Sequence, residues 1–225
     1  MKTSTKCAGK LGSISFFGIL GLILILPISL RADVSLPPIF SDHAVLQKAA
    51  RVPIWGKASP GENVEVVLGA ASAMSTAGAD GKWRVTLDLS EAPPGPLVLL
   101  IKGKNQITVS DVLIGEVWLC SGQSNMEFTL TDLTTDTMEI AGSANQMLRQ
   151  FYVENVDTGV VPDDSKGKWV IAAPETSGRF TAVGYYFGKV LQKELHSPVG
   201  LIQDARGASL CIGGGEGMAV CIEVL

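Results

Sequence analysis

The pattern of apolar residues changes near Val112, and this change constrains the fold more than any other feature of the sequence. Before it, short runs alternate apolar and polar residues between turn signals, a pattern typical of half-buried antiparallel strands. After it, apolar runs become continuous and alternate with helical segments, which is typical of strands buried on both faces of a parallel sheet. We therefore expect an α/β chain with a small β-sandwich domain over 33–111 and a parallel sheet over 112–209.

The first of these regions is predicted from its turns and its alternation. Tight turns are expected at Pro60-Gly61 and Asp80-Gly81. In the run "GKWRVTLDL", apolar residues occupy every second position, so one face of this strand should meet a core. We interpret Trp55 and Trp83 as core residues.

The second region predicts a strand, a helix and a strand in succession. The strand candidates are "VLIGEVWLC", "QFYVENV" and "VGLIQ". The segment "FTAVGYYFGKVLQKEL" is predicted to be a helix, and its apolar stripe is expected to consist of Val183, Phe187, Val190 and Leu191. A helix in this position connects parallel strands. Because open parallel sheets bind ligands at the carboxyl ends of their strands, the turns "SGQSNM" and "DARGAS" should share that edge.

The start of the chain is expected to be an export signal over 1–32. Three lysines precede a nearly uncharged apolar run, and the small residue Ala32 offers a cleavage point. An uncleaved membrane anchor is the alternative, although a spanning helix needs about 20 apolar residues and Pro27 and Arg31 interrupt the run. We expect an exported protein, either periplasmic or extracellular.

Composition limits the partners and cofactors. The net charge is −4 with no basic block, so we expect neither nucleic acid nor a membrane surface as a partner, apart from that anchor. His43 and His196 are the only histidines, so no metal cluster can be assembled and no cofactor is expected. His43 is interpreted as a structural or surface residue. Cys120 is interpreted as a small buried hydrophobe, and no disulfide is required.

Ser124 in "CSGQSNM" is the candidate nucleophile. A serine at the end of a strand, beside N–H groups of a turn and a helix start, can attack a carbonyl and help to hold the oxyanion. Gly207 could add a second N–H. Gln123 and Asn125 flank the serine and either orient substrate or stabilise the turn. The alternative is an ordinary turn in which Ser124 or Asn125 caps a helix.

Six segments resemble, in the same order, the exported sialate O-acetylesterase-like proteins, a branch of the SGNH hydrolases. They are "LPPIFSDHAVLQ", "VPIWGKASPGENVEV", "DGKWRVTLDL", "VLIGEVWLCSGQSNME", "FTAVGYYFGKVLQKEL" and "PVGLIQDARGAS". The resemblance implies a flavodoxin-like esterase domain that follows the β-sandwich and removes acetyl groups from sugars. It also implies that Ser124 is the nucleophile, and that the backbone N–H groups of Ser124 and Gly207 form the oxyanion hole. Where the family usually carries a Trp-Gly-Gly-Thr-like turn, this chain has "RGAS".

A serine esterase also needs a base for the serine proton. His196 precedes the strand "VGLIQ", so it should lie at the opposite edge of the sheet from Ser124, roughly 15 to 20 Å away. By the resemblance, the Asp, His and Asn that complete the site lie downstream of Gly207, where this chain has an atypical tail over 210–225 with no strand alternation.

We therefore expect a truncated product with an incomplete sheet and impaired or absent activity on acetylated carbohydrates. The alternative is a non-catalytic, secreted glycan-binding or surface module built on the β-sandwich. No glycan site is readable from the sequence, because Trp55 and Trp83 are interpreted as core.

Overall fold

The structure is a computed structural model that describes residues 33–122, 124–133, 137–153, 167–204 and 219–223. The predicted export signal lies outside these residues. None of the described helices has the length and apolar character that a membrane span requires.

The first half of the described chain is built from antiparallel strands, as predicted. They are β2 (Val52–Lys57), β3 (Asn63–Leu68), β4 (Ala71–Thr76), β5 (Lys82–Leu87) and β6 (Leu97–Lys102). The short β1 (Val45–Gln47) instead pairs in parallel with residues 113–115. β2 pairs with β5, while β3 pairs with β4 and β6. Gly61 and Gly81 have φ angles of 75° and 74°, so both predicted turns use the left-handed conformation that glycine permits.

The alternation in β5 correctly predicts its buried face. Trp83, Val85 and Leu87 join a hydrophobic core with residues of β2, β3 and β6, whereas Trp55 on β2 is 42% exposed. The prediction that Trp55 is a core residue was therefore wrong. The period of two places it on the outer side of β2, because its neighbours Ile54 and Gly56 are the buried ones.

One long strand connects the two halves. β7 (Gln106–Gly122) pairs with β6 through its first part and with β10 (Val199–Asp204) through its second part. It crosses the predicted boundary between 111 and 112 without a break in the strand. The division into a β-sandwich domain over 33–111 and an esterase domain over 112–209 stays a prediction.

The second half contains a mixed sheet of the α/β class, in the order β11–β7–β10–β8–β9. β10 runs parallel to both β7 and β8 (Asn145–Val153), as the strand–helix–strand pattern predicts. β9 (Gly167–Ala172) and β11 (Ala219–Glu223) are antiparallel to their neighbours. The predicted parallel sheet is therefore parallel in β7, β10 and β8, and an antiparallel strand lies at each edge.

The prediction of a tail without strand structure was wrong for Ala219–Glu223. This segment forms β11 against the carboxyl-terminal part of β7. The sequence "AVCIE" contains the β-branched residues Val220 and Ile222, which favour extended backbone. The open edge of β7 supplies the hydrogen-bonding partner. The rest of the 210–225 tail lies outside the described residues.

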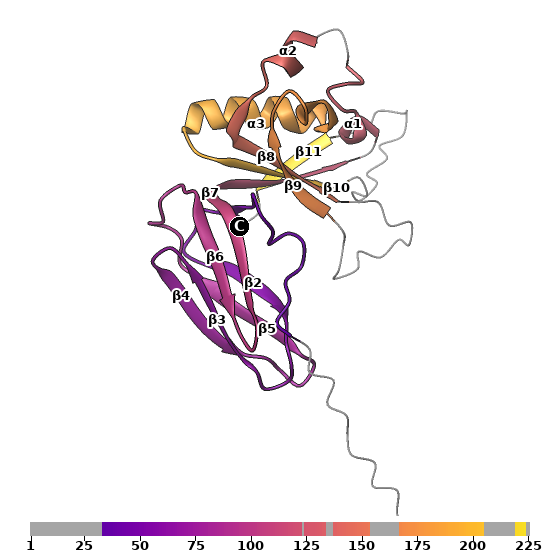
Figure 1. The fold of residues 1–225 in the computed structure, drawn as a ribbon. Coiled ribbons are helices and arrows are strands. Elements are labelled where there is room, and N and C mark those ends of the chain that lie inside the picture. The colour runs from indigo at the N-terminus through magenta and orange to yellow at the C-terminus, as the bar shows by residue number, and fades with distance from the viewer. Residues whose placement is uncertain (1–32, 123, 134–136, 154–166, 205–218, 224–225) are drawn as a thin grey trace, which may run out of the picture. The chain divides into compact units, whose positions relative to one another are not determined.

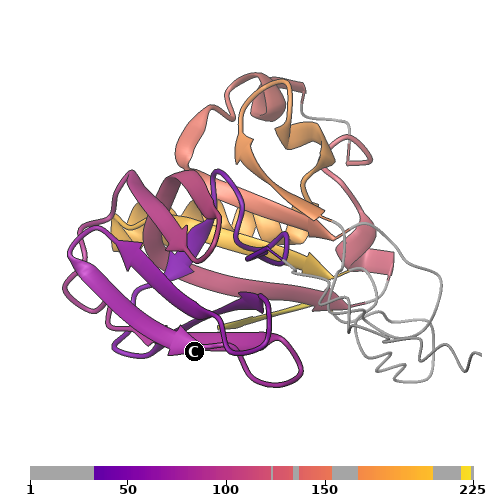
Figure 2. The same cartoon turned by 60° about the horizontal axis from the view of Figure 1, so that its bottom comes forward.

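Helix α3 (Ala182–Leu195) packs on β10 and β8 and covers one face of this sheet (Figure 1, Figure 2). The other helical elements are short: α1 (Ser124–Glu127), α2 (Thr137–Ala141) and a 3-10 turn at Ser177–Arg179. On the opposite face of the sheet, Ala44 and Val45 pack with Phe151 and Trp169 in a separate hydrophobic cluster. The described part of the sheet is thus buried on both faces.

The predicted apolar stripe of α3 was only half right. Phe187 and Leu191 pack against the core, but Val183 and Val190 are exposed. The buried face consists of Ala182, Gly184, Tyr185 and Gly188. Small residues lie against the sheet because α3 approaches it closely: a Cβ added at Gly184 would lie 3.1 Å from the sulfur of Cys120.

Candidate active site at the end of β7

Ser124 is the first residue of α1, immediately beyond the carboxyl end of β7. The parallel register pairs Asp204, the last residue of β10, with Ser121 of β7. The chain therefore leaves β7 toward Ser124 and leaves β10 toward Gly207 from neighbouring strand ends. This is the edge at which open parallel sheets bind ligands.

Among the other predicted site residues, Asn125 is exposed on α1. Gln123 and Gly207 lie outside the described residues. The oxyanion-hole role of Ser124 and Gly207 and the supporting roles of Gln123 and Asn125 therefore stay predictions.

A buried polar network holds α1 in place. The Nε2 of Gln203 on β10 donates to the carbonyl oxygen of Met126 at 3.4 Å, and the hydroxyl of Thr181 donates to the Met126 sulfur at 3.1 Å. Gln150 on β8 joins these contacts: its Nε2 donates to Gln203 Oε1 at 2.7 Å, and its Oε1 accepts from the Thr181 N–H at 3.1 Å. All four residues are buried.

This network fixes the turn that carries Ser124 from beneath, through side chains of two parallel strands. A fully satisfied buried network is rigid, because breaking any one bond leaves a polar group without a partner. Neither Gln150 nor Gln203 was among the predicted site residues. Each glutamine stands within a run that was predicted to be a strand, "QFYVENV" and "VGLIQ", and this placement is the local signal that could have identified them.

A cavity of about 380 Å³ lies beside this network. Gln150 and Phe180 line it, together with Tyr152 on β8, Lys168 on β9 and Arg179. Thr129 and Glu175 also contribute. The lining combines an exposed aromatic ring with charges of both signs, which suits a polar, ring-shaped ligand.

A short turn following α1 leads to the mouth of this cavity. The N–H and hydroxyl of Thr129 both donate to Oδ2 of Asp132, at 2.9 Å and 2.8 Å. These two hydrogen bonds lower the pKa of Asp132. The turn is tied to the start of α3 by the Ala182 N–H, which donates to the Phe128 carbonyl oxygen at 2.8 Å.

Neither histidine of the chain lies at this edge. His196 is the left-handed residue that ends α3, just before the amino end of β10, where Val199 pairs with Glu116. The six residues of β10 separate that end from Asp204, a span of roughly 15 to 20 Å. His43 is hydrogen-bonded to Asp111, which precedes Gly122 by about 35 Å of strand. This edge of the sheet therefore contains no imidazole from either histidine.

Three further residues of β7 have defined surroundings. Cys120 is buried in the core beneath α3 and forms no disulfide. Trp118 packs edge-on against Phe187, with ring centroids 5.0 Å apart. The carboxylate of Glu116, for which the sequence offers no partner, accepts a hydrogen bond from Gln47 Nε2 at 3.1 Å. Across the described residues, no group of three or more His, Cys, Asp or Glu side chains is arranged to hold a metal ion.

Comparison with known proteins places this site in context. No family model matches the chain. Sialate O-acetylesterase from Mus musculus is 31% identical over 216 residues, which are 86% of this chain and 40% of that protein. The Homo sapiens protein of the same name is 32% identical over 218 residues, covering 85% of this chain and 41% of that protein.

A solved structure agrees with these relatives. The crystal structure of a carbohydrate acetylesterase from Xanthomonas citri superposes with a TM-score of 0.71 at 36% identity, over 76% of this chain and 40% of that one. Fold and sequence together therefore define an esterase-like protein with a mixed α/β sheet. The chain is similar to sialate O-acetylesterases, as the sequence resemblance predicted, and it spans about 40% of the length of the curated relatives it matches.

Proposed function

We propose that this chain carries the nucleophile-bearing part of a carbohydrate O-acetylesterase, with Ser124 as the nucleophile. The observation that carries the proposal is the position of Ser124 at the paired carboxyl ends of β7 and β10, over the Gln150–Gln203 network. The relatives support the substrate class, since they are sialate O-acetylesterases and a carbohydrate acetylesterase.

The proposed chemistry is acyl transfer. The hydroxyl oxygen of Ser124 attacks the acetyl carbonyl carbon, and the backbone N–H groups of Ser124 and Gly207 stabilise the negative oxygen that forms. The bond between the acetyl carbon and the sugar oxygen then breaks. The sugar oxygen takes up the proton that the Ser124 hydroxyl lost, and acetyl-serine remains. Water then attacks the acetyl-serine, releases acetate and returns the proton to the serine oxygen.

The serine proton needs an acceptor within hydrogen-bond reach. His196 and His43 lie toward the other end of β7 and β10. We therefore propose that these 225 residues hydrolyse acetyl esters slowly or not at all, because they position the nucleophile without an imidazole base. Serine hydrolases that lose one member of the triad still accelerate the reaction by about 10³ to 10⁴ relative to water alone.

The cavity beside the network is the proposed substrate pocket. Tyr152 is exposed within it, so its ring can pack on the face of a sugar. Lys168 and Arg179 can donate charge-assisted hydrogen bonds to sugar oxygens or to a carboxylate.

The finer architecture is part of the proposal. We assign the parallel strands β7, β10 and β8 with α3 to the flavodoxin-like fold of SGNH hydrolases, preceded by a β-sandwich domain. We also propose that residues 1–32 direct export to the periplasm or the extracellular space.

Acetate release from O-acetylated sialic acid and from acetylated xylan tests this function. We expect slow release by the purified chain, loss of that release in Ser124→Ala, and no change in Ser90→Ala, which alters a serine of an exposed turn elsewhere. Release that survives Ser124→Ala would show that another group is the nucleophile.

A further inference from the structure

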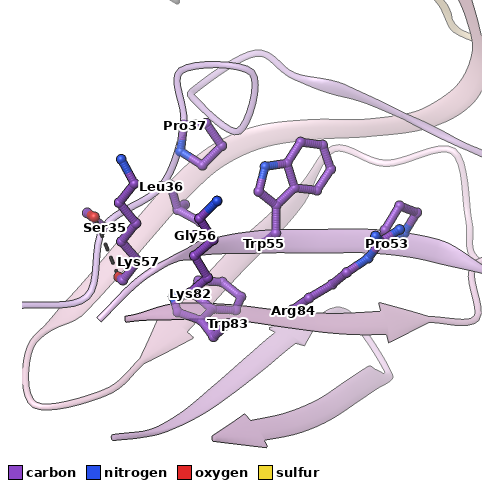
Figure 3. A pocket seen from close by; sticks show the side chains of 10 residues that line it. All are labelled: Ser35, Leu36, Pro37, Pro53, Trp55, Gly56, Lys57, Lys82, Trp83 and Arg84. Atoms are coloured by element: carbon purple, nitrogen blue, oxygen red, sulfur yellow. Dashed lines mark hydrogen bonds between the residues drawn. The ribbon is translucent and has the colours of Figure 1, made fainter. Parts of the chain in front are cut away.

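The outer face of the β2–β5 pair contains a cavity that the proposed esterase site does not use. Its volume is about 540 Å³, within the range of roughly 300 to 1,000 Å³ typical of small-molecule sites. Six of the residues that line it are Pro37, Pro53, Trp55, Lys57, Lys82 and Arg84 (Figure 3). β2 and β5 form a two-stranded sheet separate from the sheet that carries Ser124.

The strand period explains why these side chains share one face. Along β2, Pro53, Trp55 and Lys57 alternate with buried residues, and along β5 so do Lys82 and Arg84. The antiparallel register places Trp55 opposite Arg84 and Lys57 opposite Lys82. Directly opposed side chains on one face lie within contact distance. The face is therefore an aromatic ring surrounded by cationic groups.

Trp55 is held in a defined orientation while much of its surface stays open. The buried ring of Phe40 meets it edge-on, with centroids 4.7 Å apart and an interplanar angle of 80°. Trp55 nevertheless remains 42% exposed, and Figure 3 shows its indole standing out from β2. An oriented, exposed indole offers an apolar platform on which a ligand ring can stack.

The charge of the cavity is of one sign. Its described lining contains three cationic side chains and no Asp or Glu. The chain as a whole has a net charge of −4, so this cationic face is a local feature.

We propose that this cavity binds an acidic carbohydrate, and that it does so independently of catalysis at Ser124. The pyranose ring stacks on Trp55, and the carboxylate accepts hydrogen bonds from the guanidinium of Arg84 and from the lysines. Arg84 suits this role because a guanidinium donates two parallel hydrogen bonds to one carboxylate. Uronic and sialic acids share this combination of a sugar ring and a carboxylate.

Binding to immobilised oligosaccharides tests the proposal with the full chain. The probes are oligogalacturonate, a sialyl oligosaccharide, a neutral xylo-oligosaccharide of equal length and tripolyphosphate. The variants are Trp55→Ala, Arg84→Gln, Ser124→Ala and Met74→Ala, the last removing an exposed apolar side chain from β4 as the matched control.

We expect at least one acidic sugar to bind, and Trp55→Ala and Arg84→Gln each to weaken that binding by about tenfold. Binding should also weaken as salt is raised, and Ser124→Ala and Met74→Ala should bind as the parent does. A preference between the two acidic sugars then identifies the ligand. Binding of tripolyphosphate alone, equal binding of the neutral sugar, or unchanged binding by Trp55→Ala would each overturn the proposal.

Discussion

Asp111 is the residue at which contacts between the two halves of the described chain converge. It adopts a φ of 55° where the pairing of β6 with β7 shifts register. Its carboxylate is hydrogen-bonded to His43 at 2.6 Å and accepts from Arg149 at 3.0 Å. Burial by itself raises the pKa of Asp111, but the hydrogen bonds from His43 and Arg149 outweigh it and lower the pKa.

This shift makes the contribution of Asp111 dependent on pH. A carboxyl group whose folded-state pKa is lowered stabilises the fold above its unfolded-state pKa near 4, and that contribution is lost as pH falls through the folded-state pKa. We expect Asp111→Asn to lower the free energy of unfolding by about 3 kcal/mol at pH 7, because Arg149 loses its charge partner. Urea unfolding at pH 7 and pH 3 measures the effect, with Asp80→Asn in an exposed turn as control. A difference from the parent that is the same at both pH values would contradict this account.

Gln150 provides a second test at the scale of one residue. Gln150→Leu keeps the approximate size of the side chain but removes the acceptor of the Thr181 N–H and the donor to Gln203. We expect a loss of about 2 kcal/mol in the free energy of unfolding, because buried polar groups are left without partners. Gln192→Leu is the matched control, since its amide accepts from Asn145 in a less buried position. Equal stability of the two variants would show that the network does not hold α1.

At the scale of the element, the contact between α3 and the sheet depends on small residues. A Cβ added at Gly184 would lie 3.1 Å from the sulfur of Cys120 on β7 and 2.7 Å from Thr181 Cγ2, whereas Val190 is 60% exposed. We expect Gly184→Val to lower the free energy of unfolding by about 3 kcal/mol through overpacking. Val190→Ala should change it by less than about 0.5 kcal/mol. Thermal unfolding of both variants measures these changes. A larger loss of stability in Val190→Ala than in Gly184→Val would support the predicted stripe, in which Val190 faces the core.

At the scale of the whole molecule, β7 makes the two halves share one strand. We therefore expect residues 33–223 to unfold in a single cooperative transition, although the sequence predicts two domains. Two double variants can report the halves separately. Trp118→Phe with Trp169→Phe leaves Trp55 and Trp83, and Trp55→Phe with Trp83→Phe leaves Trp118 and Trp169. Coincident fluorescence midpoints support shared cooperativity. Separate midpoints would show that the halves unfold as independent domains.

Features that depend on local sequence patterns were predictable, whereas features that depend on contacts between residues distant in the sequence were not. The strands β5 and β10 and the helix α3 were predictable because their patterns are local. The exposure of Trp55 could have been read from the period of two, had the buried neighbour Ile54 been used to set the face of β2. The edge strands β9 and β11 were not predicted, because each is formed by pairing with another strand, β8 or β7, and not by a local sequence pattern.

The candidate site divides in the same way. Ser124 and its strand end follow from a local motif and from the parallel order of β7 and β10. The bonds among Gln150, Gln203 and Met126 join residues far apart in the sequence, so no local pattern reveals them. The partner of Glu116 was hidden for the same reason, because Gln47 lies on β1.

The measurement that tests the central claim most directly is mass spectrometry of the chain after incubation with 4-nitrophenyl acetate. Without an imidazole base, water should attack acetyl-serine slowly, so the acetyl group should accumulate on the peptide that contains Ser124. We predict acetylation of that peptide in the parent and in Ser90→Ala, and none at that position in Ser124→Ala. A parent chain that remains unacetylated at Ser124, or a Ser124→Ala chain that gains the acetyl group in the same peptide, would contradict Ser124 as the nucleophile.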